Sequence, residues 1–220
     1  MINNVGPMKR GDGAENKLIF LLTLNLLIMT SVMTGCVPTR VTDLSFHKLG
    51  IVDYDSVPFR EEVGGSGKHP GEKVLRVEFS STAELGSIAK RKEVNLWLRA
   101  NMCSERPSPL IAYSAIYLGD VEVGKFGYRD KEKEHYLELA RKTPPGMPYQ
   151  YHFYMEYKND REGTLGNMTE GAPVYHPYDL IRDPSDVCVT IKGGGMHAVY
   201  LLFHSNTFVI PKKAFAEISR

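Results

Sequence analysis

Histidine is the side chain best suited to move a proton or hold a metal near neutral pH, so the histidines show where chemistry could occur. The seven in this chain are His47, His69, His135, His152, His176, His197 and His204. None forms a His-Glu-x-x-His motif or lies four residues from another, as a helical zinc site requires. His152 falls on the polar side of a predicted strand, which indicates a surface residue more than a base. We expect no metal site and no cofactor.

Nucleophile and phosphate motifs are also missing from the sequence. No Gly-x-Ser-x-Gly occurs, and the adjacent acids Glu61 and Glu62 fall in a predicted flexible loop, which is a poor catalytic scaffold. The glycines and lysine of Gly64–Lys68 resemble a phosphate-binding loop, but Glu62 stands at its first glycine position and His69 follows the lysine. We therefore predict that the protein is not an enzyme and has no small-molecule substrate.

The N-terminal segment has the layout of a secretory signal peptide. Positive charges, the last of them Lys17, precede an apolar run from Leu18 to Met29, and small and polar residues follow. The run is shorter than the roughly 20 apolar residues that a spanning helix needs, and Asn25 interrupts it. We predict that residues 1–35 are a signal peptide, and the Met-Lys-Arg that begins at Met8 is a better start than Met1.

The segment ends in Met33-Thr34-Gly35-Cys36, which resembles the lipobox of bacterial lipoproteins. In that family the cysteine is acylated and becomes the first residue, so the resemblance implies lipidation at Cys36. Three acyl chains suffice for stable membrane anchoring. Val37 follows the cysteine, as in the lipoproteins of the outer membrane. The alternative is an ordinary secretory signal with a chance cysteine.

Two cysteines, Cys103 and Cys188, remain after Cys36. In an oxidising periplasm they are most simply one disulfide, which would stabilise the fold by about 3–5 kcal/mol in the chain-entropy model. The alternative is two buried thiols. No Cys-x-x-Cys pair suggests redox or zinc chemistry.

Charge gives no indication of a nucleic-acid partner. The chain has 27 Lys and Arg against 26 Asp and Glu, and residues 1–35 hold three of the first and two of the second. Residues 36–220 are therefore neutral, whereas nucleic-acid binding calls for a basic excess. Their length fits a single domain.

Alternating apolar residues predict about eight or nine strands in residues 36–220, with turn signals between them, hence an antiparallel β-sandwich. Ser81–Lys90 is predicted as a short helix or turn capped by Ser81, His135–Leu139 as strand or helix, and Lys212–Ile218 as a C-terminal helix. The Gly119-Asp120 pair predicts a hairpin, and Val37–Arg40 a tether. The predicted strands are 43–53, 74–79, 93–102, 110–118, 121–126, 150–158, 187–191, 198–203 and 207–210.

Two long polar segments, Pro58–Lys73 and Asn159–Asp183, are the candidates for partner binding, because long loops are often functional. The second carries Tyr175, His176 and Tyr178, and tyrosine is a typical interface residue. The alternative is that these rings only cover one end of the sandwich.

The C-terminal third resembles the small periplasmic lipoproteins that act as immunity proteins of type VI secretion systems. The resemblance rests on Asp186–Val189, Lys192–Met196 and Ser205-Asn206, about 35 residues in all. It implies a protein that binds and blocks a toxic effector and has no active-site residues. The alternative is a structural lipoprotein of an envelope or secretion complex, because Arg106–Pro109 before an apolar strand is similar to the sandwich-fold lipoprotein of that machine.

Overall fold

The computed structural model describes residues 39–58, 71–104, 108–113, 115–125, 127–160, 176–195 and 203–218. Pro38–Arg220 form one compact unit, to which every element below belongs. The predicted signal peptide, Cys36 and Tyr175 lie outside the described residues, as do residues 59–70 and 161–175 of the two long predicted loops.

The first sheet has the strand order β1-β12-β11-β4-β5, and β13 pairs with β11 as well. All of its pairings are antiparallel except that of β1 with β12, which is parallel. The predicted tether at Val37–Arg40 is therefore partly wrong, because β1 begins there. The strands are β1 (Thr39–Val41), β4 (Asn95–Met102), β5 (Pro109–Leu110), β11 (Val187–Gly194), β12 (Phe203–Ser205) and β13 (Phe208–Ile210).

The second sheet has the order β2-β3-β8-β6-β7 and is antiparallel throughout. Its hairpin β6-β7 turns at Gly119 and Asp120 as predicted, and Gly119 has a φ of 61°. A separate two-stranded ribbon pairs β9 with β10. The strands are β2 (Ser45–Asp53), β3 (Lys73–Ser81), β6 (Tyr117–Leu118), β7 (Val121–Glu122), β8 (Tyr149–Met155), β9 (Lys158–Asn159) and β10 (Tyr178–Asp179).

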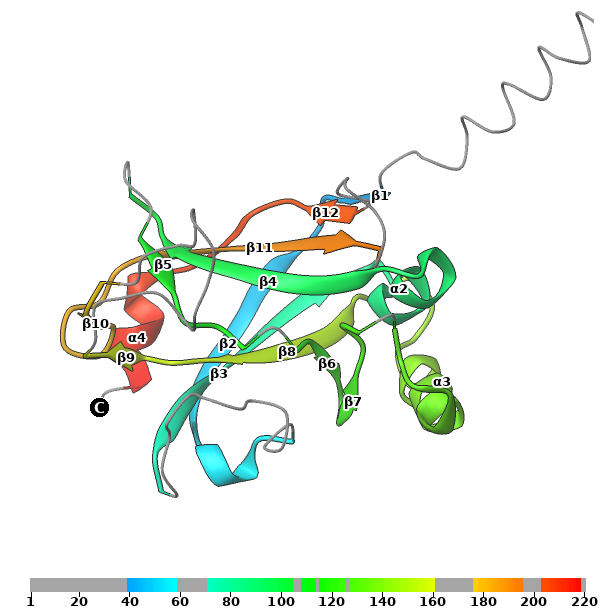
Figure 1. Cartoon of the computed structure of the whole chain (residues 1–220), viewed down its shortest axis with the longest axis horizontal. Coiled ribbons are helices and arrows are strands. Elements are labelled where there is room, and N and C mark those ends of the chain that lie inside the picture. Colours follow the sequence, from blue (N-terminus) through cyan, green and yellow to red (C-terminus); the bar gives the residue numbers. More distant parts are fainter. Residues whose placement is uncertain are drawn as a thin grey trace, which may run out of the picture. The chain divides into compact units, whose positions relative to one another are not determined.

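The two sheets pack face to face, so the predicted β-sandwich is confirmed (Figure 1). Alternate residues of the long strands point inward and form one core; Phe79, Phe153, Val189 and Phe208 are among its buried members. Phe79 stacks on Tyr151 within its own sheet and on Phe208 of the facing sheet, with ring centroids 5.5 and 5.4 Å apart. Period-two alternation thus places the core as it does in other sandwiches.

Helices close the two ends of the sandwich, α4 at one and α2 with α3 at the other (Figure 1). The C-terminal helix α4 is confirmed with its predicted bounds, and it buries Ala214 and Phe215. The ambiguous segment at His135–Leu139 is helical. The helical elements are η2 (Tyr54–Ser56), α2 (Leu85–Lys92), η3 (Asp130–Glu132), α3 (Lys133–Arg141) and α4 (Lys212–Ile218).

Two local predictions are wrong for reasons of tertiary structure. Ser81 does not cap α2; it ends β3 and donates a hydrogen bond to Asp43 Oδ1 (2.8 Å), while Glu84 occupies the cap position. The predicted strand 187–191 is too short, because β11 runs on through Gly193 to Gly194. There Gly193 is required by packing, because a Cβ would lie 2.8 Å from Leu96 Cδ2.

The predicted central strand Leu110–Leu118 is also wrong. Its first residues belong to β5 in the first sheet and its last to β6 in the second, so the chain crosses between the layers here. On the way Ala112 forms a bridge with Met155, beyond the paired part of β6. The continuous apolar pattern reflects burial along this crossing, which periodicity alone does not distinguish from a buried strand.

Candidate functional site

Two of the three residues predicted to contact a partner, His176 and Tyr178, lie in the described part of the chain, and they differ in exposure. His176 is exposed, and its carbonyl oxygen accepts a hydrogen bond from Asn159 Nδ2 (3.3 Å). Tyr178 is buried; its hydroxyl accepts a hydrogen bond from Ile111 N (3.0 Å) and donates to Glu156 O (3.4 Å). The ring of Tyr178 therefore belongs to the core and its hydroxyl joins two backbone segments, whereas its predicted contact with a partner stays a prediction.

Cys103 and Cys188 form the predicted disulfide. Cys188 points away from the core on β11, and Cys103 follows the last residue of β4, next to it in the sheet. The bond links residues 85 apart in the sequence. It therefore joins the neighbouring ends of two strands across the outer surface of the first sheet, where the chain-entropy model predicts a large effect on stability.

A cluster of polar side chains lies on the outer face of the second sheet. Register places Glu78 of β3 directly opposite His152 of β8, and Arg76 opposite Tyr154. Tyr117 of β6 is opposite His152 on its other side, and the two rings stack with centroids 5.3 Å apart. Three strands therefore converge on His152, which was predicted to be a surface residue and is only 5% exposed.

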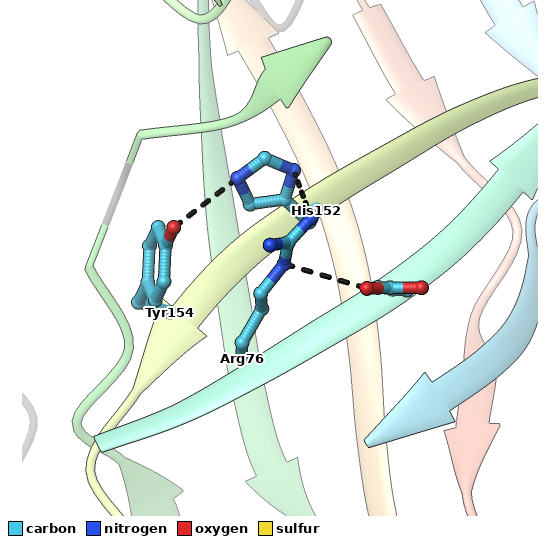
Figure 2. Close-up of polar contacts among 4 residues, drawn as sticks. Arg76, His152 and Tyr154 are labelled. Atoms are coloured by element: carbon cyan, nitrogen blue, oxygen red, sulfur yellow. Dashed lines mark hydrogen bonds and ion pairs between the residues drawn. The ribbon is translucent and has the colours of Figure 1, made fainter. Parts of the chain in front are cut away.

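Hydrogen bonds hold the two ring nitrogens of His152 in different roles (Figure 2). Arg76 Nη2 lies 3.5 Å from Nδ1, and Tyr154 Oη lies 3.3 Å from Nε2. Because a guanidinium can only donate, Nδ1 accepts, and the proton of the neutral ring is on Nε2 and is donated to Tyr154. Arg76 Nε also lies 3.4 Å from Glu78 Oε1.

The surroundings keep His152 neutral. Burial lowers its pKa to about 4, and the neighbouring charge of Arg76 acts in the same direction. Burial also raises the pKa of Tyr154, against the opposing effect of Arg76. With Nδ1 occupied by Arg76 and a low pKa, His152 is poorly suited to remove a proton from a substrate. Its role in this geometry is to bridge Arg76 and Tyr154.

Aromatic rings surround this cluster and form a second, smaller core outside the sheet. Tyr54 and Val57, in and after η2, pack there with Tyr113, Tyr117 and Tyr154. Tyr117 meets Tyr154 edge to face, with centroids 5.9 Å apart. One part of the outer face is therefore covered by aromatic residues, and the cluster lies at the edge of that cover.

Charged groups at this edge reach solvent although the rings beneath them are buried. The side chains of Arg76 and Glu78 are 40% and 32% exposed, whereas His152 and Tyr154 are each 5% exposed as whole residues. Arg76 thus contacts His152 through Nη2 and Glu78 through Nε, and its side chain as a whole stays partly exposed. An arginine set beside buried tyrosines is typical of the residues that dominate protein interfaces.

The sequence did not indicate this cluster, because apolar and polar residues alternate regularly in the strand Gln150–Lys158. Such alternation predicts one buried face and one exposed face. Tyr151, Phe153 and Met155 point into the main core as predicted, but Tyr154 and Glu156 on the opposite side are also buried. The only signal was the aromatic character of Tyr154 on a side predicted to be polar. When distant segments cover both faces of a strand, the period of its apolar residues does not reveal that both faces are buried.

A depression of about 460 Å³ lies between α3 and the start of β8. Leu137, Ala140, Pro144, Met147 and Tyr149 are among the residues that line it, and Met147 is 58% exposed. Arg141 and Glu84 supply its charged lining. The depression is mainly apolar, and it can accommodate a side chain of a partner as readily as a small ligand.

Within the described ranges, no group of three or more His, Cys, Asp or Glu residues is placed to hold a metal ion. Among the same residues, no helix is both long and apolar enough to span a bilayer. Comparisons with protein-family models, with curated proteins and with solved structures find no match to this chain. The fold and the cluster around His152 therefore have to be interpreted from their own geometry.

Proposed function

We propose that this protein is exported, anchored in the outer membrane through acylated Cys36, and binds and blocks an antibacterial effector of a type VI secretion system. The observation that carries the proposal is the disulfide between Cys103 and Cys188 in a chain that begins with a lipobox-like segment. Disulfides persist in oxidising compartments such as the periplasm. The resemblance of the C-terminal strands to periplasmic immunity lipoproteins supports the more specific part.

The outer face of the second sheet is the surface we assign to effector binding. Glu78 and His152 contact Arg76, so little conformational entropy is lost when this partly exposed side chain meets a partner. The neighbouring tyrosines are buried and pack beneath this surface, so they keep it ordered. A carboxylate on the effector is the group that best fits Arg76, because it can accept two parallel hydrogen bonds. Blocking follows if the bound loop of the effector borders its substrate cleft.

Anchoring is tested by the mass and location of the mature protein. The proposal expects an N-terminal Cys36 carrying acyl chains and a protein recovered with the outer membrane. A Cys36→Ala variant should lose both properties. An unacylated mature protein in the soluble periplasmic fraction would overturn the anchor.

Immunity is tested in the native strain. A deletion strain should be killed by sister cells that carry the secretion system, and the acylated protein should capture a secreted effector in stoichiometric amount. Arg76→Glu should lose protection and capture, whereas Lys213→Glu, an exposed charge reversal on α4 at one end of the sandwich and away from that face, should keep both. Survival of the deletion strain, or equal capture by both variants, would contradict the proposal.

The two-sheet sandwich also favours a second candidate, a structural lipoprotein of the secretion machine. That class is likewise a lipid-anchored sandwich. Deletion separates the two functions, because a structural component is needed for secretion itself, whereas an immunity protein is needed only by the target cell. The proteins captured by the acylated chain, an effector or core components of the machine, give an independent reading.

A further inference from the structure

The outer face of the first sheet carries a row of basic residues that crosses three neighbouring strands and ends at a tryptophan on a fourth. Arg40 of β1 pairs with His204 of β12, His204 with Lys192 of β11, and Lys192 with Trp97 of β4. Paired residues share a face of the sheet, and the buried neighbours of each point to the core. Arg99, two residues beyond Trp97 on β4, adds another cation on this side.

The outward positions of this sheet hold cations but no carboxylate within the described residues. Three carry Lys or Arg in a chain whose residues 36–220 are neutral. Arg40 and Lys192 lie on either side of His204, and none of the described outward positions offers them a carboxylate partner. A face exposed only to water normally mixes both signs. The outward positions are Arg40, Asn95, Trp97, Arg99, Asn101, Pro109, Cys188, Thr190, Lys192, Gly194, His204 and Val209.

Two apolar side chains lie among these cations. Trp97 is partly exposed, and Val209 is 45% exposed. Tryptophan is enriched where proteins meet the headgroup region of a bilayer, because its ring is apolar and its N–H still finds a polar partner. Cations combined with tryptophan are therefore the composition expected of a surface that lies on phospholipid headgroups.

The covalent chain keeps this face close to the proposed anchor. Arg40 is four residues after Cys36, and an extended chain spans at most about 3.6 Å per residue, so their Cα atoms are within about 14 Å. A lipid anchor at Cys36 thus keeps Arg40, at one end of the basic row, within about that distance of the acylated residue.

We propose that this basic face, the outward side of the first sheet around Arg40, Lys192, Arg99 and Trp97, lies against anionic phospholipid headgroups. The inference rests on the proposed function, because the acyl chains supply the nearby membrane. The attraction is electrostatic and non-directional. It orients the molecule so that the outer face of the second sheet, with Arg76, points away from the bilayer and is open to a partner in the periplasm.

Trp97 is the only tryptophan of the chain and reports directly on this face. The purified acylated protein is reconstituted into vesicles of phosphatidylethanolamine with or without phosphatidylglycerol, each containing a lipid with a nitroxide on its headgroup. Trp97 emission should be blue-shifted and strongly quenched only in vesicles that contain phosphatidylglycerol, and salt should reverse both effects because it screens exposed charges. Each of Arg40→Gln, Arg99→Gln and Lys192→Gln should weaken the population in contact about fivefold.

Lys48→Gln is the matched control, because Lys48 is also an outward-facing strand lysine but belongs to the second sheet. It should leave the quenching unchanged. Quenching that ignores phosphatidylglycerol, or falls equally with Lys48→Gln and Lys192→Gln, overturns the inference.

The same samples separate this inference from the anchor. A chain that carries its acyl groups and floats with the vesicles, but whose Trp97 is not quenched, keeps the anchor and refutes the membrane-facing sheet. A chain without acyl groups refutes the anchor. The protein without acyl groups is then mixed with preformed vesicles. Quenching of Trp97 that still needs phosphatidylglycerol supports the membrane contact of the basic face without the anchor. If Trp97 is not quenched, the membrane contact is refuted together with the anchor.

Discussion

The two outward faces of the sandwich differ in how their charges are arranged. On the first sheet, Arg40, His204 and Lys192 follow one another across neighbouring strands without an intervening acid. On the second sheet, Lys48 lies opposite Glu78, and Glu78 lies opposite His152, which is neutral. The first face is basic, and the second is mixed in sign and partly covered by tyrosines.

This difference shows that a neutral chain can still present a charged surface. Net charge excluded a general attraction to anions, but strand register gathers cations on one face of one sheet. The basic face suits a partner without fixed geometry, such as a membrane surface. The mixed face, in which Arg76 contacts His152 and pairs with Glu78, suits a partner with a defined shape.

The first sheet also carries the disulfide on its outer surface, and removing this bond should give the largest change in the free energy of unfolding. Replacing Cys103 and Cys188 together by alanine should lower the free energy of unfolding by about 4 kcal/mol, because the bond closes a loop of 85 residues. Urea denaturation measures this value. Reducing agent should destabilise the unchanged protein by a similar amount and leave the double variant unaffected; an equal response of both would contradict the account.

The mixed face should respond to pH through His152. Its pKa is about 4 in the folded protein and about 6.5 in an unfolded chain, so the unfolded state binds more protons between these values. Stability contributed by neutral His152 is therefore complete above pH 6.5 and is lost as the pH falls towards 4, by about 3 kcal/mol in total. Urea denaturation at a series of pH values measures the slope.

Other groups titrate in the same range, so the comparison with His152→Gln isolates the histidine. The variant keeps a polar side chain of similar length but cannot be protonated. The difference between the two pH profiles should show the loss below pH 6.5. Parallel profiles would mean that His152 is not held neutral by its surroundings.

A glycine in the first sheet should tolerate no side chain. A Cβ at Gly193 would lie 2.8 Å from Leu96 Cδ2 and 3.0 Å from Asn95 O and Phe203 Cβ. Because backbone is among these neighbours, Gly193→Ala should destabilise the protein by about 1–3 kcal/mol. Thermal unfolding measures the change. A shift confined to one degree or less would show that the strands beneath the basic face can separate to admit a methyl group.

Much of the sandwich was predictable because its strands have one buried face. Val187, Val189 and Ile191 alternate with Cys188 and Thr190, and the structure follows that pattern. The disulfide followed from the number of cysteines and the predicted compartment. The hairpin at Gly119 followed from its turn residues.

The candidate site was not predictable, because it depends on contacts between distant segments. His152 becomes buried only when Tyr117 of β6 stacks on its ring and Arg76 of β3 lies beside it. Tyr178 becomes part of the core because its hydroxyl meets the backbone of Ile111. The basic row likewise requires the pairing of β1 with β12, a parallel contact between residues at opposite ends of the chain.

The smallest expected change in stability distinguishes binding from folding on the mixed face. Gly50 lies in β2 opposite Arg76, and a Cβ built there has no neighbour within 4 Å. Glycine inside a strand costs roughly 0.5–1 kcal/mol relative to alanine, so Gly50→Ala should raise the free energy of unfolding by that amount. No neighbour among the described residues of the folded protein requires glycine at this position, whereas close approach of a partner's backbone would require it. If the effector approaches the face beside Arg76, Gly50→Ala will stabilise the protein and yet weaken capture of the effector. Calorimetry measures the first and titration the second; undiminished capture would place the contact elsewhere on the second sheet.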